Sequence, residues 1–150
     1  MIDKLLKKVM HRLTQEESNP TADNLQIATA VLFLELAYAD FELAPAEEEK
    51  IRKSLRAFFD MEDGDLDDLL LLAREKREQR DDIWLFTDTI KKNWPHATRV
   101  RVLEMLWQLV FADGHMDIQE EALMRKLTNL LGLSHGDMIM ARRAANTTDI

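Results

Sequence analysis

Carboxylate side chains recur in this 150-residue chain at one spacing, in two stretches that lie 73 positions apart. In the first stretch, Asp40 ends an apolar segment and is followed seven residues later by Glu47. In the second stretch, Asp113 and Glu120 repeat the same arrangement. Carboxylate oxygens are hard ligands that suit calcium, magnesium or manganese rather than zinc or copper. If the two stretches converge in the fold, Asp40 and Asp113 could share one metal ion.

The same acids also have a purely structural interpretation. An Asp at a junction between helices can accept backbone N–H bonds, and a Glu at a helix N-terminus is stabilised by the helix dipole. The second stretch is not an EF-hand loop, because Ile118 stands where the loop needs Gly and Met124 where it needs Glu. The residues alone therefore leave metal binding and helix capping open.

Composition excludes several other chemistries. The chain has no cysteine, so it has no disulfide, thiolate metal site or cysteine nucleophile. It contains neither a P-loop nor a zinc-protease motif, and it shows no nucleophile elbow. A formal charge of −8 argues against general nucleic-acid binding. The absence of these catalytic motifs predicts a non-enzymatic protein. Charges interrupt the apolar N-terminus, and no segment is long enough for a membrane span, so we predict a cytoplasmic location.

The acids must be positioned by helices. Helix-forming residues are abundant, and four glycines and three prolines are few for a chain of short strands, so we predict an all-α fold. The apolar spacing predicts helices over about 2–16, 22–39, 45–59, 82–93, 97–112, 118–131 and 135–144. An acidic hinge at 60–68 leads into a further helix that ends near residue 80. Ser134 with Asp137 is predicted to cap the last helix, and Gly132 to stop the one before it.

We expect one domain, with an N-terminal amphipathic helix and linker at 1–21, a core at 22–145 and a frayed tail at 146–150. The helices at 22–39 and 97–112 are apolar nearly all round, which places them in the middle of the domain. Residues 2–13 carry a basic face that could lie on an anionic membrane surface. Docking of their apolar face on the core is the favoured interpretation.

The doubled motif resembles the TerB-like tellurite-resistance family, which includes TerB and the N-terminal region of the DjlA co-chaperone. The resemblance rests on Phe111-Ala112-Asp113-Gly114-His115-Met116 with Glu120 and Glu121, and on Tyr38-Ala39-Asp40-Phe41-Glu42-Leu43 with Glu47 and Glu48. It covers residues 22–145, and the first copy departs from the family by having Phe41 where Gly is usual. It implies a bundle of seven to eight helices with internal pseudo-two-fold duplication. It also implies metal binding or sensing through Asp40, Glu47, Asp113 and Glu120, in stress-response assemblies with a protein partner.

We therefore predict a non-enzymatic TerB-like binding module that holds a divalent cation at the two acidic junctions. The alternative is a protein-interaction scaffold in which the acids are only helix caps.

Overall fold

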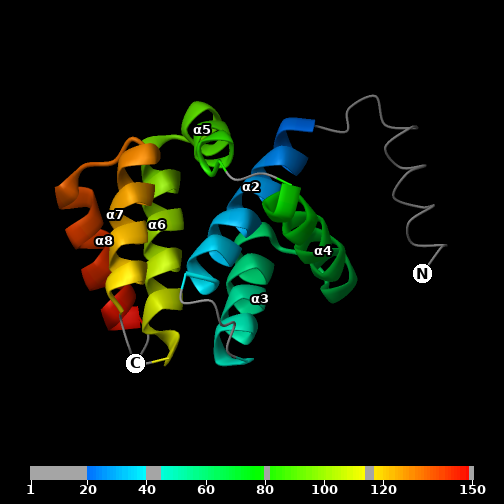
Figure 1. Cartoon of the computed structure of the whole chain (residues 1–150), viewed down its shortest axis with the longest axis horizontal. Coiled ribbons are helices and arrows are strands. Elements are labelled where there is room, and N and C mark those ends of the chain that lie inside the picture. Colours follow the sequence, from blue (N-terminus) through cyan, green and yellow to red (C-terminus); the bar gives the residue numbers. More distant parts are fainter. Residues whose placement is uncertain (1–19, 40–44, 80–81, 114–116, 149–150) are drawn as a thin grey trace.

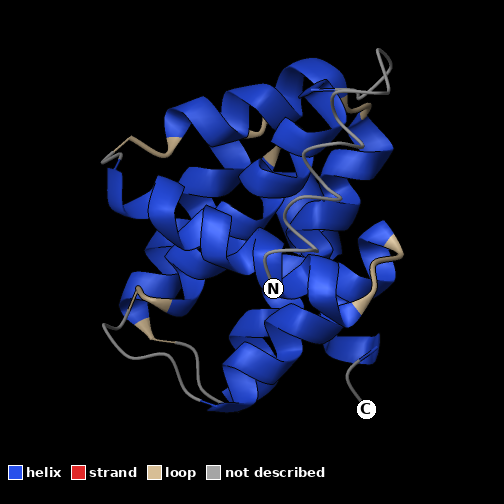
Figure 2. Cartoon of the chain, turned by 90° about the vertical axis from the view of Figure 1, so that its right-hand side faces the viewer, coloured by secondary structure: helices blue, strands red, loops and turns tan. Residues whose placement is uncertain are grey.

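The computed structural model describes residues 20–39, 45–79, 82–113 and 117–148, and within them the chain forms only helices, turns and loops (Figure 2). The helices are α2 (Pro20–Ala37), α3 (Pro45–Phe59), α4 (Asp63–Gln79), α5 (Trp84–Asn93), α6 (His96–Val110), α7 (Ile118–Leu130) and α8 (His135–Thr148), with a short 3-10 helix, η1 (Phe111–Asp113), after α6. The predicted all-α fold is confirmed. The helix predicted over 2–16 lies outside the described residues.

Several predicted boundaries differ from the structure, and three of them have a local explanation. α2 begins at Pro20 instead of residue 22, because proline is well tolerated in the first turn of a helix. α4 begins at Asp63, inside the predicted acidic hinge, because the helix dipole stabilises acidic residues in the first turn. α8 continues to Thr148, past the predicted start of the frayed tail at Asn146. Burial of Ala145 extends the packing of α8 beyond the predicted end.

Helix α2 lies at the centre of the molecule. In Figure 1 it runs between α3 and α4 on one side and α6, α7 and α8 on the other, and it packs against α3, α4, α5, α6 and α7. Its residues from Ala28 to Leu34 are all buried, as the apolar sequence predicts. The buried hydroxyl of Thr29 donates to the carbonyl of Leu25 at 2.7 Å, so it leaves no unpaired donor. Among the described helices, none is long and apolar enough to cross a membrane.

The predicted end signals of the last two helices are confirmed. Gly132 follows α7 with φ +71°, a left-handed conformation that costs glycine little. The Ser134 hydroxyl accepts from the Asp137 N–H at 3.0 Å, and the Asp137 carboxylate accepts from the Ser134 N–H at 2.9 Å. This reciprocal pair caps the N-terminus of α8.

Helix boundaries recur along the chain at nearly constant spacing. α6 ends 73 positions after α2, and α7 begins 73 positions after α3, whereas α8 begins 72 positions after α4. The buried residues follow the same registers, with Leu66, Leu69 and Ala73 of α4 matched by Met138, Ala141 and Ala145 of α8. The most extensive packing is that of α2 on α4 and of α6 on α8. These spacings agree with the predicted duplication, which itself stays a prediction, and they define corresponding positions in the two halves.

Candidate functional site

The two acidic junctions lie where the central helices end. The first connects α2 to α3, and Asp40 falls in its part outside the described residues. The second runs from α6 through η1 to α7, and the backbone of Asp113 forms the last residue of η1. The side chain of Asp113 also lies outside the described part of the structure. The distance between the Asp40 and Asp113 carboxylates, on which the predicted shared site depends, therefore stays untested.

The two glutamates of each pair occupy different environments. Glu47 and Glu120, the first of each pair, are buried with 3% and 4% of their surfaces exposed. Glu48 and Glu121 face outward, where Glu48 lies 3.5 Å from Arg74 and Glu121 lies 2.7 Å from Arg125. Capping by the helix dipole needs no burial, so it accounts for the outward members, whereas the burial of Glu47 and Glu120 needs a further reason.

Part of the burial of Glu120 follows from a capping box. The Asp117 carboxylate accepts from the Glu120 N–H at 2.7 Å, and a Glu120 carboxylate oxygen accepts from the Asp117 N–H at 3.3 Å. The position 73 residues before Asp117 is Ala44, which has no carboxylate. The capping box at the start of α7 therefore has no sequence counterpart at the start of α3.

The described part of the second junction packs against the first half of the molecule. η1, which ends at Asp113, packs against α3, the helix that carries Glu47. α3 also packs against α6. Within the described part of the chain, no three His, Asp or Glu side chains group closely enough to hold a metal ion. A metal site of three or more His, Asp or Glu side chains at the junctions would therefore have to include a side chain outside the described part of the structure, such as that of Asp40 or Asp113.

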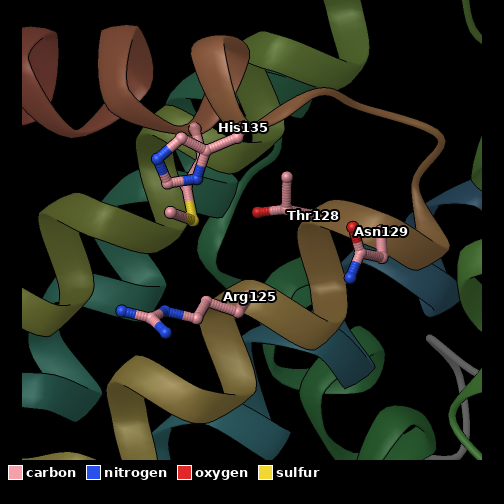
Figure 3. Close-up of a pocket in the computed structure, with 5 residues that line it drawn as sticks. Arg125, Thr128, Asn129 and His135 are labelled. Atoms are coloured by element: carbon pink, nitrogen blue, oxygen red, sulfur yellow. The ribbon is translucent and has the colours of Figure 1, made fainter.

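A second candidate site, which the motif search missed, is a pocket between α7 and α8. Its cavity volume is about 150 Å³, and Figure 3 shows Arg125, Thr128 and Asn129 of α7 and His135 of α8 around the open space. Met138 completes the lining. Thr128 is buried and its hydroxyl donates to the Met124 carbonyl at 2.7 Å, while Arg125, Asn129 and His135 are exposed. In the sequence, the pocket could have been found by comparing the two halves position by position, because polar and uncharged residues replace charged and apolar ones here.

Comparison with known proteins identifies the family. The family model described as "Tellurite resistance protein TerB" matches residues 26–143, which include α3 to α7 and most of α2 and α8. No curated protein and no solved structure matches the chain significantly. The match spans more than half of the chain and both acidic junctions. The chain therefore belongs to the TerB family of tellurite resistance proteins.

Proposed function

We propose that this protein is a non-catalytic binding module whose two acidic junctions hold a divalent cation. Asp40, Glu47, Asp113 and Glu120 would supply the oxygen ligands, and calcium, magnesium or manganese would suit them. Family membership supports a TerB-like module, and the family name connects such modules with tellurite resistance. A role in stress response with a protein partner, in the cytoplasm, forms part of the proposal.

The observation that carries the proposal is the burial of Glu47 and Glu120. Two corresponding carboxylates, one from each half, lie inside the protein at helix starts rather than in solvent. Glu47 and Glu120 already have interactions within the protein, and a cation held by Asp40 and Asp113 would add a further favourable interaction with these two buried carboxylates. The packing of η1 on α3 supports a site to which both halves contribute. When bound, the cation would neutralise negative charge at the junctions and tighten the connections of α2 and α6.

Thermal unfolding with added metal tests the proposal. A cation present at 100 times its Kd should stabilise the folded state by about 2.7 kcal/mol, which raises Tm. The double substitution of Asp40→Asn and Asp113→Asn should abolish the metal-induced rise with little change in shape. Glu48→Gln with Glu121→Gln is the matched control, because it removes the same charge from outward-facing positions, and it should leave most of the rise intact. No change in Tm at millimolar calcium, magnesium or manganese would overturn the proposal.

The alternative function, an interaction scaffold with structural acids, is favoured by the capping box at Asp117 and Glu120. Loss of an N-cap costs about 1 kcal/mol whether or not metal is present. Under this alternative, Asp117→Ala and Asp113→Asn should each lower Tm, and the loss for each variant should be the same with metal as without it. Under the metal proposal, Asp113→Asn should in addition reduce the metal-induced rise in Tm.

A further inference from the structure

Ion pairs close the outer surface between α3 and α4 in the first half of the molecule. Arg52 lies 2.7 Å from Asp67, and Arg56 lies 2.6 Å from Asp63, so two guanidinium groups of α3 bind two carboxylates of α4. Beneath them, Leu55 and Leu66 are fully buried. Each arginine of α3 on this surface thus has a carboxylate partner within the protein.

The corresponding surface of the second half keeps the first arginine and loses both carboxylates. Arg125 stands 73 positions after Arg52, but the counterparts of Asp67 and Asp63, 72 positions on, are Ile139 and His135. The other counterparts change too, from Arg56 to Asn129 and from Leu55 to Thr128. The described pocket lies at this place, lined by Arg125, Thr128, Asn129, His135 and Met138.

We propose that the α7–α8 pocket binds a carboxylate of a protein partner, namely the side chain of an exposed Asp or Glu. The partner would supply from outside the group that α4 supplies within the first half. Arg125 would bind the carboxylate through its planar fork of N–H donors, whereas Arg52 contacts Asp67 through Nη1. The Asn129 amide and a ring N–H of His135 would donate to the same oxygens.

The charges around the pocket favour one carboxylate. None of the five lining residues is acidic, and Arg125 is the single permanent cation among them. Its present partner is Glu121 on the same helix, at 2.7 Å, and an exposed pair of this kind contributes little stability. The neighbouring carboxylate of Asp137 is engaged elsewhere, by the Ser134 N–H and by His96 at 3.0 Å. An incoming carboxylate therefore competes only with a weak, solvent-exposed interaction at Arg125.

NMR titration of the full chain with three probes tests the proposal. The first is an alanine-based helical peptide with one central Glu, the second is the same peptide with Gln, and the third is inorganic phosphate. We expect saturable shifts of the Asn129 side-chain amide and the Arg125 Nε–H with the Glu peptide, and none with the Gln peptide. Phosphate that binds as tightly as the Glu peptide would overturn the proposal, because the pocket would then be a site for free oxyanions.

Exchange of residues between the halves gives a sharper test. Arg125→Gln should raise the Kd for the Glu peptide by about tenfold or more, because it removes one charge-assisted hydrogen-bonded pair. Asn129→Arg adds a cation and should tighten binding, whereas His135→Asp adds an anion and should weaken it. The double variant, Asn129→Arg with His135→Asp, has the formal charge of the wild type. It recreates across the pocket the ion pair that Arg56 and Asp63 form, so it should not bind the Glu peptide.

The double variant separates a pocket from a general charge effect. If it binds the Glu peptide as the wild type does, long-range charge governs binding and the proposal is wrong. Both substituted positions are exposed, and an unchanged Tm would show that the fold is kept. Neither result depends on metal binding at the junctions, because the pocket lies between α7 and α8 and uses none of the four proposed metal ligands.

Discussion

The surface between α3 and α4 differs from the surface between α7 and α8, although the boundaries of these helices correspond at a spacing of 72 to 73 residues. Between α3 and α4, arginine–carboxylate pairs cover buried leucines. Between α7 and α8, the carboxylates are replaced and a polar pocket remains. Most core-facing positions are apolar in both halves, because their burial stabilises the fold, but buried Leu55 corresponds to buried Thr128. Surface ion pairs contribute little to stability, so they can be lost from one half and their place can serve binding.

The central helices differ in the size of several corresponding core residues, including Leu34 and Trp107. Leu34 of α2 and Trp107 of α6 lie 73 positions apart, and both are fully buried. The Trp107 ring stacks on Phe111 with centroids 5.8 Å apart, and the guanidinium of Arg142 lies 5.2 Å from the ring centroid. The indole N–H of Trp107 is buried and has no hydrogen-bond partner in the described structure. The second half therefore gains more apolar contact here and leaves one donor unpaired.

Truncation of the larger residue should give the largest effect. Trp107→Ala should lower the free energy of unfolding by about 3–5 kcal/mol, because it removes apolar burial and leaves a cavity. Leu34→Ala is the matched change in α2, with an expected loss of about 2–5 kcal/mol. Urea unfolding at equilibrium measures both. A Trp107→Ala loss below 1 kcal/mol would mean that the second half tolerates collapse around this position.

The ends of α3 and α7 provide the next comparison. Asp60 and Gly132 lie 72 positions apart, and both have positive φ, +52° and +71°. A Cβ at Gly132 would lie 2.9 Å from Nη1 of Arg99, which donates to the Leu131 carbonyl at 2.6 Å. Gly132→Ala should therefore lower the free energy of unfolding by about 1–2 kcal/mol, because alanine is strained in the left-handed backbone conformation. Displacement of the Arg99 side chain by the new Cβ should lower it further.

Asp60→Ala is the matched change in the first half. Its loss of stability should be smaller, because the wild-type Asp60 is already a non-glycine residue in the left-handed conformation. Thermal unfolding of both variants at one pH gives the comparison. Equal losses would show that Arg99 moves aside freely and contributes nothing at Gly132.

Filling the pocket floor should make the second half resemble the first. Thr128→Leu introduces the residue found at the corresponding position, Leu55, and cavity filling commonly adds about 0.5–2 kcal/mol. Thr128→Val is the control, because it removes the hydroxyl without filling the space. Chemical denaturation should rank Leu above Val. A Leu variant less stable than Val would show that the pocket has no room for the longer side chain.

A dependence on pH is expected at the start of α8. The Ser134 N–H and then the His96 side chain lower the pKa of Asp137 below its ordinary 3.8. A carboxylate whose folded pKa is depressed stabilises the fold above its unfolded pKa and loses this effect as pH falls through the folded value. Tm should therefore fall below about pH 4 in the wild type, and part of that fall should vanish in Asp137→Asn. Parallel Tm curves for the two proteins between pH 5 and pH 2 would contradict this expectation.

Much of the fold could be predicted from the sequence. The apolar spacing placed the helices, and short-range signals such as Gly132 and the Ser134–Asp137 pair marked their ends correctly. Prediction failed where local and tertiary effects compete. Acidic residues at 63–68 suggested a hinge, but burial of Leu66, Leu69 and Leu70 holds them in a helix. Of the candidate metal ligands, the sequence identified Glu47 and Glu120 as a corresponding pair without indicating that both are buried.

By itself, the sequence determined the all-α class, the approximate helices and the repeated acidic spacing. These depend on periodicity, helix propensity and capping, which act between residues close in the chain. Only the tertiary structure decided which glutamate of each pair is buried, that η1 packs on α3, and that a pocket opens between α7 and α8. Burial and cavities depend on how distant segments pack. A change such as Leu55 to Thr128 therefore becomes meaningful only when its neighbours across the helix interface are known.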